Sequence, residues 1–96
     1  MSENSIALTG VIKGRVQGVF FRAETQRVAE SLGLRGWCRN TPEGHVEVYL
    51  AGDKASVTKM QTWLNKGPEL ARVDSVELIQ CTKLENQIQQ GFEIRY

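Results

Sequence analysis

The apolar residues of this chain switch between two periods, and the order of the switches limits the folds that the chain can adopt. Ile6, Leu8 and Ile12 recur at multiples of two residues, as in a strand, whereas from Phe21 to Leu32 apolar residues recur every three or four residues, as in a helix. The pattern predicts, in order, a strand over 6–13, a loop over 14–18, a helix over 21–32, strands over 36–40 and 45–50, a helix over 54–66, a strand over 72–83 and a short strand over 92–96.

Residues that favour turns and caps stand at the ends of these segments. Gly33 follows the first helix at the position of a left-handed cap. Residues 41–44, Thr-Pro-Glu-Gly, give a tight-turn signal, so the strands on either side are expected to form a hairpin. Asp53 is placed to cap the second helix, and the Gly-Pro pair at 67–68 is placed to end it. The polar residues 85–91 are typical of a turn.

This order of elements specifies an α+β fold in which an antiparallel sheet is covered on one face by two helices. The arrangement is the ferredoxin-like split βαβ sandwich, βαββαβ, with a short extra strand at the C-terminal end. The chain has 96 residues, of which 41% are hydrophobic and 24% are charged, an ordinary globular composition. We therefore expect a single domain over 1–96, with a flexible end over 1–5.

Charge and hydropathy limit the kinds of partner. A formal net charge of +1 gives little support to a protein that binds nucleic acid through bulk charge. No apolar stretch approaches the ~20 residues that span a bilayer, and no secretory leader precedes the first strand. We expect a cytoplasmic monomer with no nucleic-acid partner and no membrane partner.

The two cysteines, Cys38 and Cys81, are expected to pack in the core rather than to react. Together with His45 they are too few for a tetrahedral zinc site, and His45 itself is expected to be a solvated strand residue. In the expected strand order, two strands separate those that carry the cysteines. This distance is too great for a disulfide, whose Cα atoms lie within ~7 Å of each other. A pair of free thiols is typical of a reducing compartment.

Residues 14–22, Gly-Arg-Val-Gln-Gly-Val-Phe-Phe-Arg, run from the first strand into the first helix. Backbone N–H groups at a helix N-terminus lack partners and attract anions, and glycines let a loop curl until several N–H groups converge. Arg22 adds a forked guanidinium that matches two phosphate oxygens. The alternative interpretation is an ordinary turn and a solvated arginine, and neither Gly-x-Gly-x-x-Gly nor Gly-Lys-Ser/Thr is present.

The same segment resembles the acylphosphatase signature Gly-x-Val-Gln-Gly-Val-x-Phe-Arg. Residues 36–52, GWCRNTPEGHVEVYLAG, resemble the second signature of that family, and the final FEIRY resembles its usual ending. The resemblance covers residues 6–96, with both motifs in the family's order and spacing. It implies a hydrolase that cleaves carboxyl-phosphate anhydrides to a carboxylate and inorganic phosphate, without a metal or cofactor.

Residue by residue, the resemblance gives Arg22 the role of binding the phosphate and Asn40 the role of positioning the attacking water. It gives the role of cradling the phosphoryl oxygens to the backbone N–H groups of Arg15, Val16, Gln17, Gly18, Val19 and Phe20. Inorganic phosphate or sulfate is expected to bind as product or mimic. A carboxylate with a conjugate-acid pKa of about 4 leaves without a general acid. The resemblance further implies that a phosphate oxygen of the substrate takes the water's proton. Glu24 and Glu43 are the alternative bases.

Two rival functions remain open on the sequence. The first is a non-catalytic module of the same fold that binds an anion or RNA, although the basic-Gly-aromatic run of RNA-binding sheets is missing. The second is a regulatory domain of a larger carbamoyl-transfer system. The stand-alone length of the chain argues against this second function. Several further residues are given structural roles, packing for the tryptophans and surface charge for the arginines: Trp37, Trp63, Arg27, Arg35 and Arg39.

Overall fold

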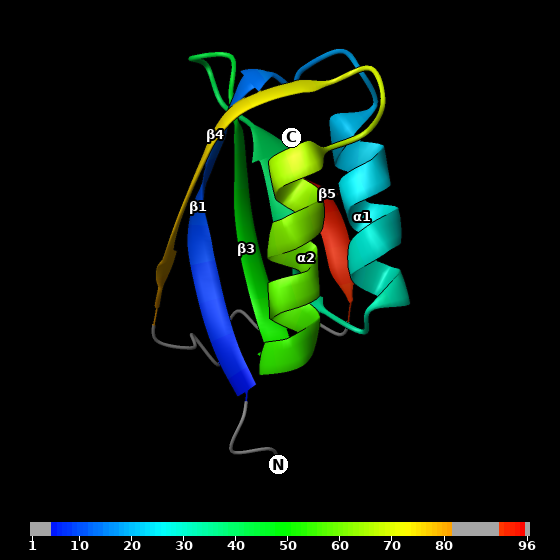
Figure 1. Ribbon diagram of the computed structural model, residues 1–96, viewed down its shortest axis with the longest axis vertical. Helices are drawn as coiled ribbons and strands as arrows, with labels where there is room; N and C mark the ends of the chain where they lie inside the picture. The colour runs from blue at the N-terminus through cyan, green and yellow to red at the C-terminus, as the bar shows by residue number, and fades with distance from the viewer. Residues whose placement is uncertain (1–4, 82–90, 96) are drawn as a thin grey trace.

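The computed structural model describes residues 5–81 and 91–95 (Figure 1). Its elements are β1 (Ser5–Arg15), α1 (Phe21–Ser31), β2 (Arg35–Asn40), β3 (Val46–Asp53), α2 (Lys54–Lys66), β4 (Arg72–Gln80) and β5 (Phe92–Arg95). The element order is therefore the predicted one. Four expectations lie wholly or mostly outside the described residues: the flexible end over 1–5, residues 82–83 of the fourth strand, most of the polar turn, and Tyr96. Of the end over 1–5, only Ser5 is described, and it is the first residue of β1 rather than a flexible one.

The strands form one sheet in the order β4-β1-β3-β2-β5. The pairs β1–β3, β1–β4 and β2–β3 are antiparallel, as predicted. The expectation of a wholly antiparallel sheet is wrong at one edge, where β5 pairs parallel with β2. The antiparallel pairs make β2 run opposite to β4. Since β5 also runs opposite to β4, it meets β2 in the parallel sense.

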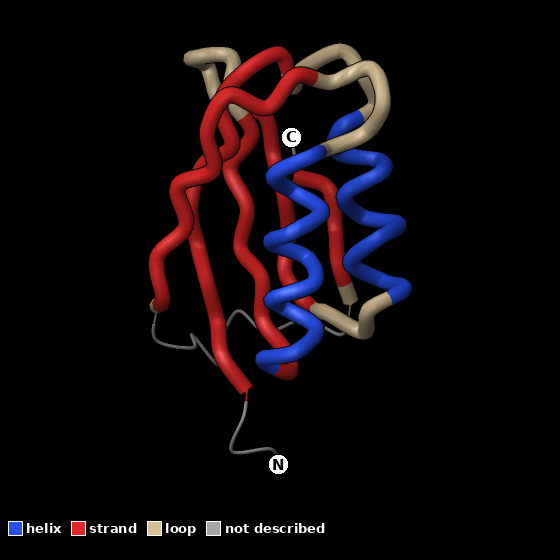
Figure 2. The backbone as a smooth tube through the Cα atoms, in the orientation of Figure 1, coloured by secondary structure: helices blue, strands red, loops and turns tan. Residues whose placement is uncertain are grey.

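Both helices lie on the same face of the sheet (Figures 1 and 2). Helix α2 lies over the middle of the sheet and α1 lies beside it, nearer to β5. The core between the layers is built from alternate residues of the strands and one side of each helix. Its fully buried members include Val46, Val48 and Leu50 from β3, Val57, Met60 and Leu64 from α2, and Ala29 from α1. The predicted ferredoxin-like α+β sandwich is confirmed.

Helix ends follow the predicted caps, but the end of β1 does not follow the prediction. Gly33 (φ 72°) and Gly67 (φ 72°) have positive φ angles after α1 and α2, and the Asp53 carboxylate accepts the Ala55 N–H at 3.1 Å. Strand β1, in contrast, does not stop at residue 13, because a bulge at Lys13/Gly14 lets it continue to Arg15. A Cβ at Gly14 would meet the Arg72 carbonyl, so this close approach requires glycine.

The tryptophans and cysteines pack as expected. Trp63 packs on Phe21 with ring centroids 5.9 Å apart, and Trp37 stacks on Tyr49 at 6.3 Å on the other face of the sheet. The two free thiols, Cys38 and Cys81, pack against clusters on opposite faces of the sheet. Two of the expected surface arginines form exposed ion pairs, Arg27 with Glu24 and Arg39 with Glu47. Within the described residues, no helix is long and apolar enough to cross a membrane.

Candidate active site

The topology brings the two sequence motifs to one end of the sheet. Strands β1 and β2 both run antiparallel to β3, so their C-terminal ends lie at the same end of the sheet. The loop after β1 leads into α1, and Arg22 lies in the first turn of that helix. Asn40 is the last residue of β2. Residues separated in sequence by a helix and a strand thus meet at one place.

The loop between β1 and α1 is tightly curled. Gly18 (φ 75°) and Phe20 (φ 62°) both take left-handed conformations, while Val16 is buried beneath the loop. Phe20 is the N-cap residue of α1 and makes no side-chain cap, as its hydrocarbon ring has no acceptor. The N–H groups of the first helical turn therefore point to the loop without a capping side chain, an arrangement suited to an anion.

Gln17 fixes this loop against the β2–β3 turn. Its Nε2 donates hydrogen bonds to the carbonyl oxygens of Thr41 at 3.0 Å and His45 at 2.8 Å. The loop and the residues next to Asn40 are thereby tied together. The resemblance assigned Gln17 a role only through its backbone. The signal in the sequence for this further role was a polar residue between two apolar ones, Val16 and Val19, which are both buried.

Arg22 is held from the side of β5. Its Nη1 donates to the Arg95 carbonyl at 3.5 Å, and one turn further along α1 the Gln26 Nε2 donates to the Phe92 carbonyl at 3.0 Å. One face of α1 is thus connected to the last strand at both ends of that strand. This support fixes the direction in which the guanidinium extends.

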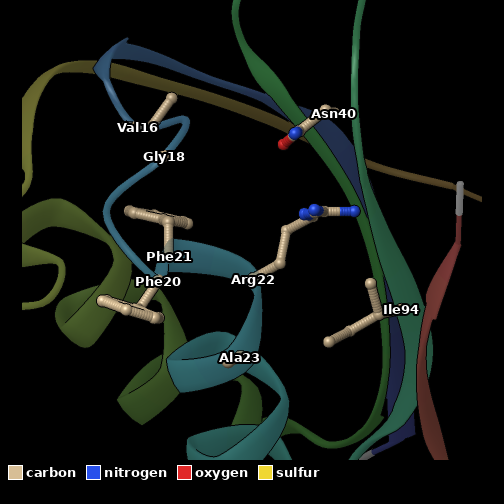
Figure 3. Close-up of a pocket in the computed structure, with 8 residues that line it drawn as sticks. All are labelled: Val16, Gly18, Phe20, Phe21, Arg22, Ala23, Asn40 and Ile94. Atoms are coloured by element: carbon tan, nitrogen blue, oxygen red, sulfur yellow. The ribbon is translucent and has the colours of Figure 1, made fainter.

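Arg22 and Asn40 line a single pocket of about 300 Å³. Figure 3 shows the guanidinium and the amide extending into the same space, opposite the start of the loop. The lining residues are Val16, Gly18, Phe20, Phe21, Arg22, Ala23, Asn40 and Ile94. The other three loop residues of the motif do not line this pocket: Arg15 ends β1, Gln17 reaches the turn, and Val19 faces a neighbouring groove.

Among the described residues that line the pocket, Arg22 carries the one charged side chain. Glu24, on the same helix, is paired with Arg27 at 2.7 Å and faces away from the pocket. Cys38 lies behind Arg22, and its Sγ contacts the Arg22 carbonyl at 3.9 Å. Burial raises the pKa of Cys38 from 9.0 to about 12, against the opposing effect of the Arg22 charge. The thiol therefore stays protonated, which makes it a poor nucleophile.

The described residues contain no group of three or more His, Cys, Asp or Glu side chains arranged to hold a metal ion. Fold and pocket together define a small ferredoxin-like protein with a cationic, amide-rich pocket at the start of its first helix. Residues 8–94 match the model of the acylphosphatase family. The chain is 45% identical over 87 residues to an acylphosphatase of Nitrosococcus oceani, covering 88% of this chain and 92% of that protein.

Solved structures agree with this match. An acylphosphatase from Coxiella burnetii superposes with a TM-score of 0.89 at 32% identity, covering 99% of this chain and 100% of that chain. An acylphosphatase from Bacillus subtilis gives a TM-score of 0.88 at 27% identity, covering 95% and 99%. The chain belongs to the acylphosphatase family, and it is a hydrolase of acyl phosphates. The interpretation as a non-catalytic anion- or RNA-binding module is therefore wrong.

Proposed function

We propose that hydrolysis proceeds by in-line attack of a water held by Asn40 on a phosphoryl group held by Arg22 and by backbone N–H groups of the loop over residues 15–20, of which Val16, Gly18 and Phe20 line the pocket. The observation that supports this most directly is the shared pocket, in which one guanidinium, one side-chain amide and the start of α1 face the same space. A guanidinium and converging N–H groups stabilise the negative charge that spreads over the equatorial oxygens in the transition state.

The proposed step needs no acid from the protein. The water oxygen forms a bond to phosphorus, the bond from phosphorus to the carboxyl oxygen breaks, and the carboxylate leaves with the electron pair. The water's proton passes to a phosphate oxygen of the substrate. Of the alternative bases, Glu24 is engaged by Arg27 and Glu43 is exposed in the β2–β3 turn. Among the described residues that line the pocket, none carries a carboxylate.

The two side chains are assigned separable roles, which steady-state kinetics with acetyl phosphate can test. Arg22→Ala is expected to raise KM about 100-fold and to abolish binding of inorganic phosphate in calorimetry, because a charge-assisted contact to the dianion is lost. Asn40→Ala is expected to lower kcat about 100-fold with a small change in KM, because only the water is released.

Arg72→Ala and Asn65→Ala are the matched controls. Arg72 is exposed on β4 and pairs with Asp74, and Asn65 is exposed on α2, so both variants should behave as wild type. An Asn40→Ala enzyme of full activity would remove the role assigned to Asn40. Glu24→Gln or Glu43→Gln enzymes that lose most activity would show that the protein supplies the base.

We also propose that the enzyme acts in the cytoplasm as a monomer. Its pocket binds inorganic phosphate or sulfate, as the product of the reaction or as a mimic of the phosphoryl group. The thiols are unpaired and one is deeply buried, which suits a reducing compartment. Arg22, Asn40 and the loop before α1 all belong to the same chain, so the residues assigned to phosphate and water do not have to come from two subunits. Light scattering at micromolar concentration tests the monomer, with a dimer mass as the contrary result.

A further inference from the structure

A groove of about 760 Å³ lies next to the phosphate pocket. Its lining residues come from the loop, α1, the end of α2 and the segment before β4: Val19, Phe20, Glu24, Arg27, Trp63, Lys66, Gly67, Pro68, Glu69 and Leu70. Phe20 lines both this groove and the phosphate pocket. The two spaces therefore meet at one side chain.

Phe20 is unusual in both its backbone and its exposure. Among the described residues it is the one non-glycine residue with a positive φ, and its side chain is 74% exposed. A bulky residue in the left-handed region costs about 1–2 kcal/mol, and exposing a phenyl ring recovers none of it. Figure 3 shows the ring pointing away from Arg22. The fold thus holds an apolar ring at the boundary of the pocket, where it contributes little to the core.

The groove beyond Phe20 combines exposed apolar side chains with charged residues whose charges cancel among the described lining residues. Leu70, a second large apolar side chain, is 68% exposed within it, and Trp63 and Pro68 add further apolar surface. Its charged residues balance, since Glu24 is paired with Arg27 and the remaining two, Lys66 and Glu69, have opposite signs. Such a surface favours an uncharged hydrocarbon over an anion.

The geometry of in-line attack indicates which part of the substrate lies in the groove. The leaving carboxylate must lie on the opposite side of phosphorus from the attacking water. Asn40 and Phe20 lie on opposite sides of the pocket (Figure 3). We infer that the acyl group leaves the phosphate pocket past Phe20 and lies in the groove with Leu70, so that the enzyme favours acyl phosphates with extended apolar acyl chains. This inference rests on the proposed placement of phosphate and water.

Chain length in the substrate tests the inference. With acetyl, butanoyl and octanoyl phosphate, kcat/KM of the wild-type enzyme should rise about tenfold from the shortest to the longest as methylene groups enter the groove. Leu70→Ser should reduce this ratio about threefold. The matched control is Ile79→Ser, because Ile79 is 69% exposed but lies on β4 and lines neither space, and it should keep the wild-type ratio.

Phe20→Asn is the second variant. Asparagine tolerates the left-handed conformation, so the loop is kept while the ring is removed, and the octanoyl-to-acetyl ratio should fall toward one. A wild-type ratio near one, or a ratio unchanged in both Leu70→Ser and Phe20→Asn, would overturn the inference. So would a preference for an acyl chain ending in a carboxylate that Lys66→Gln removes.

Arg22→Ala separates this inference from the mechanism on which it rests. Suppose that Arg22→Ala lowers hydrolysis of all three substrates equally, while Leu70→Ser keeps the wild-type ratio of kcat/KM between octanoyl and acetyl phosphate. In that case only the placement of the acyl group is wrong. If Arg22→Ala retains full activity on every chain length, the proposed phosphate site is wrong and the inference falls with it.

Discussion

At the scale of single residues, Cys38 links protonation to folding. Burial raises the pKa of this thiol to about 12, whereas the unfolded chain releases the proton near the ordinary value of 9.0. Between these values the folded state binds more protons than the unfolded state, so its stability is intact below pH 9 and decreases as the pH rises. The free energy of unfolding should fall by about 1.4 kcal/mol per pH unit from this group.

Urea unfolding at pH 8, 9.5 and 10.5 measures this slope. Because lysines and tyrosines also titrate in the range, the wild-type curve is compared with that of Cys38→Ala, which lacks the group. The variant is expected to be less stable at pH 8 because of the cavity, but its stability should decrease less steeply with pH. Parallel curves for the two proteins would show that the thiol is not protected by burial.

The same scale shows where sequence reasoning ends. The motifs identified Arg22 and Asn40, and the structure places both in one pocket. The side chain of Gln17 was not assigned a role, because its acceptors lie on a turn about two dozen residues away whose position only the fold defines. The left-handed conformation of Phe20 was also not predicted, since the motif allows many residues at this position. A strained backbone conformation does not change the spacing of apolar residues, so periodicity cannot reveal it.

At the scale of elements, the contact between α1 and β5 supports the site. Gln26 donates to the Phe92 carbonyl, and Arg22 donates to the Arg95 carbonyl of the same strand. Gln26→Ala should lower the free energy of unfolding by about 1 kcal/mol, because a partly buried hydrogen bond is lost. As β5 loosens, Arg22 loses part of its support, and KM for acetyl phosphate should rise about threefold.

Urea unfolding and steady-state kinetics on the same preparation check both effects of Gln26→Ala. Gln80→Ala, at the exposed end of β4, is the control and should change neither. Loss of stability with no change in KM would mean that β5 does not position Arg22.

Helix caps and turns were predictable at this scale, but two features of the strands were not. Gly33, Asp53 and Gly67 act through their immediate neighbours, so their effects can be read locally. The bulge after Lys13 and the parallel pairing of β5 depend on partners far along the chain. Periodicity within a segment identifies a strand but does not give the direction of the strand beside it.

At the scale of the whole molecule, the order of elements determines where chemistry can occur. An element order of this kind makes β1 and β2 parallel to each other with β3 between them, so the loop after β1 and the last residue of β2 lie at one end of the sheet. The meeting of the two motifs is therefore a consequence of topology. An anion bound between the two motifs connects the start of α1 to the end of β2. The Gln17 side chain also links the loop before α1 to the turn after β2.

Phosphate should consequently stabilise the entire fold. A ligand that binds only the native state adds about 2.7 kcal/mol at a concentration of 100 Kd, which for a domain of this size raises Tm by about 10 °C or more. Thermal unfolding followed by circular dichroism with and without sodium phosphate measures the rise, and sodium chloride of equal ionic strength controls for screening. Arg22→Ala should show no rise beyond that of the chloride control, whereas Arg72→Ala should keep it. An equal rise in Arg22→Ala and wild type would place the bound phosphate elsewhere, because this prediction requires the anion to be held where the first helix begins.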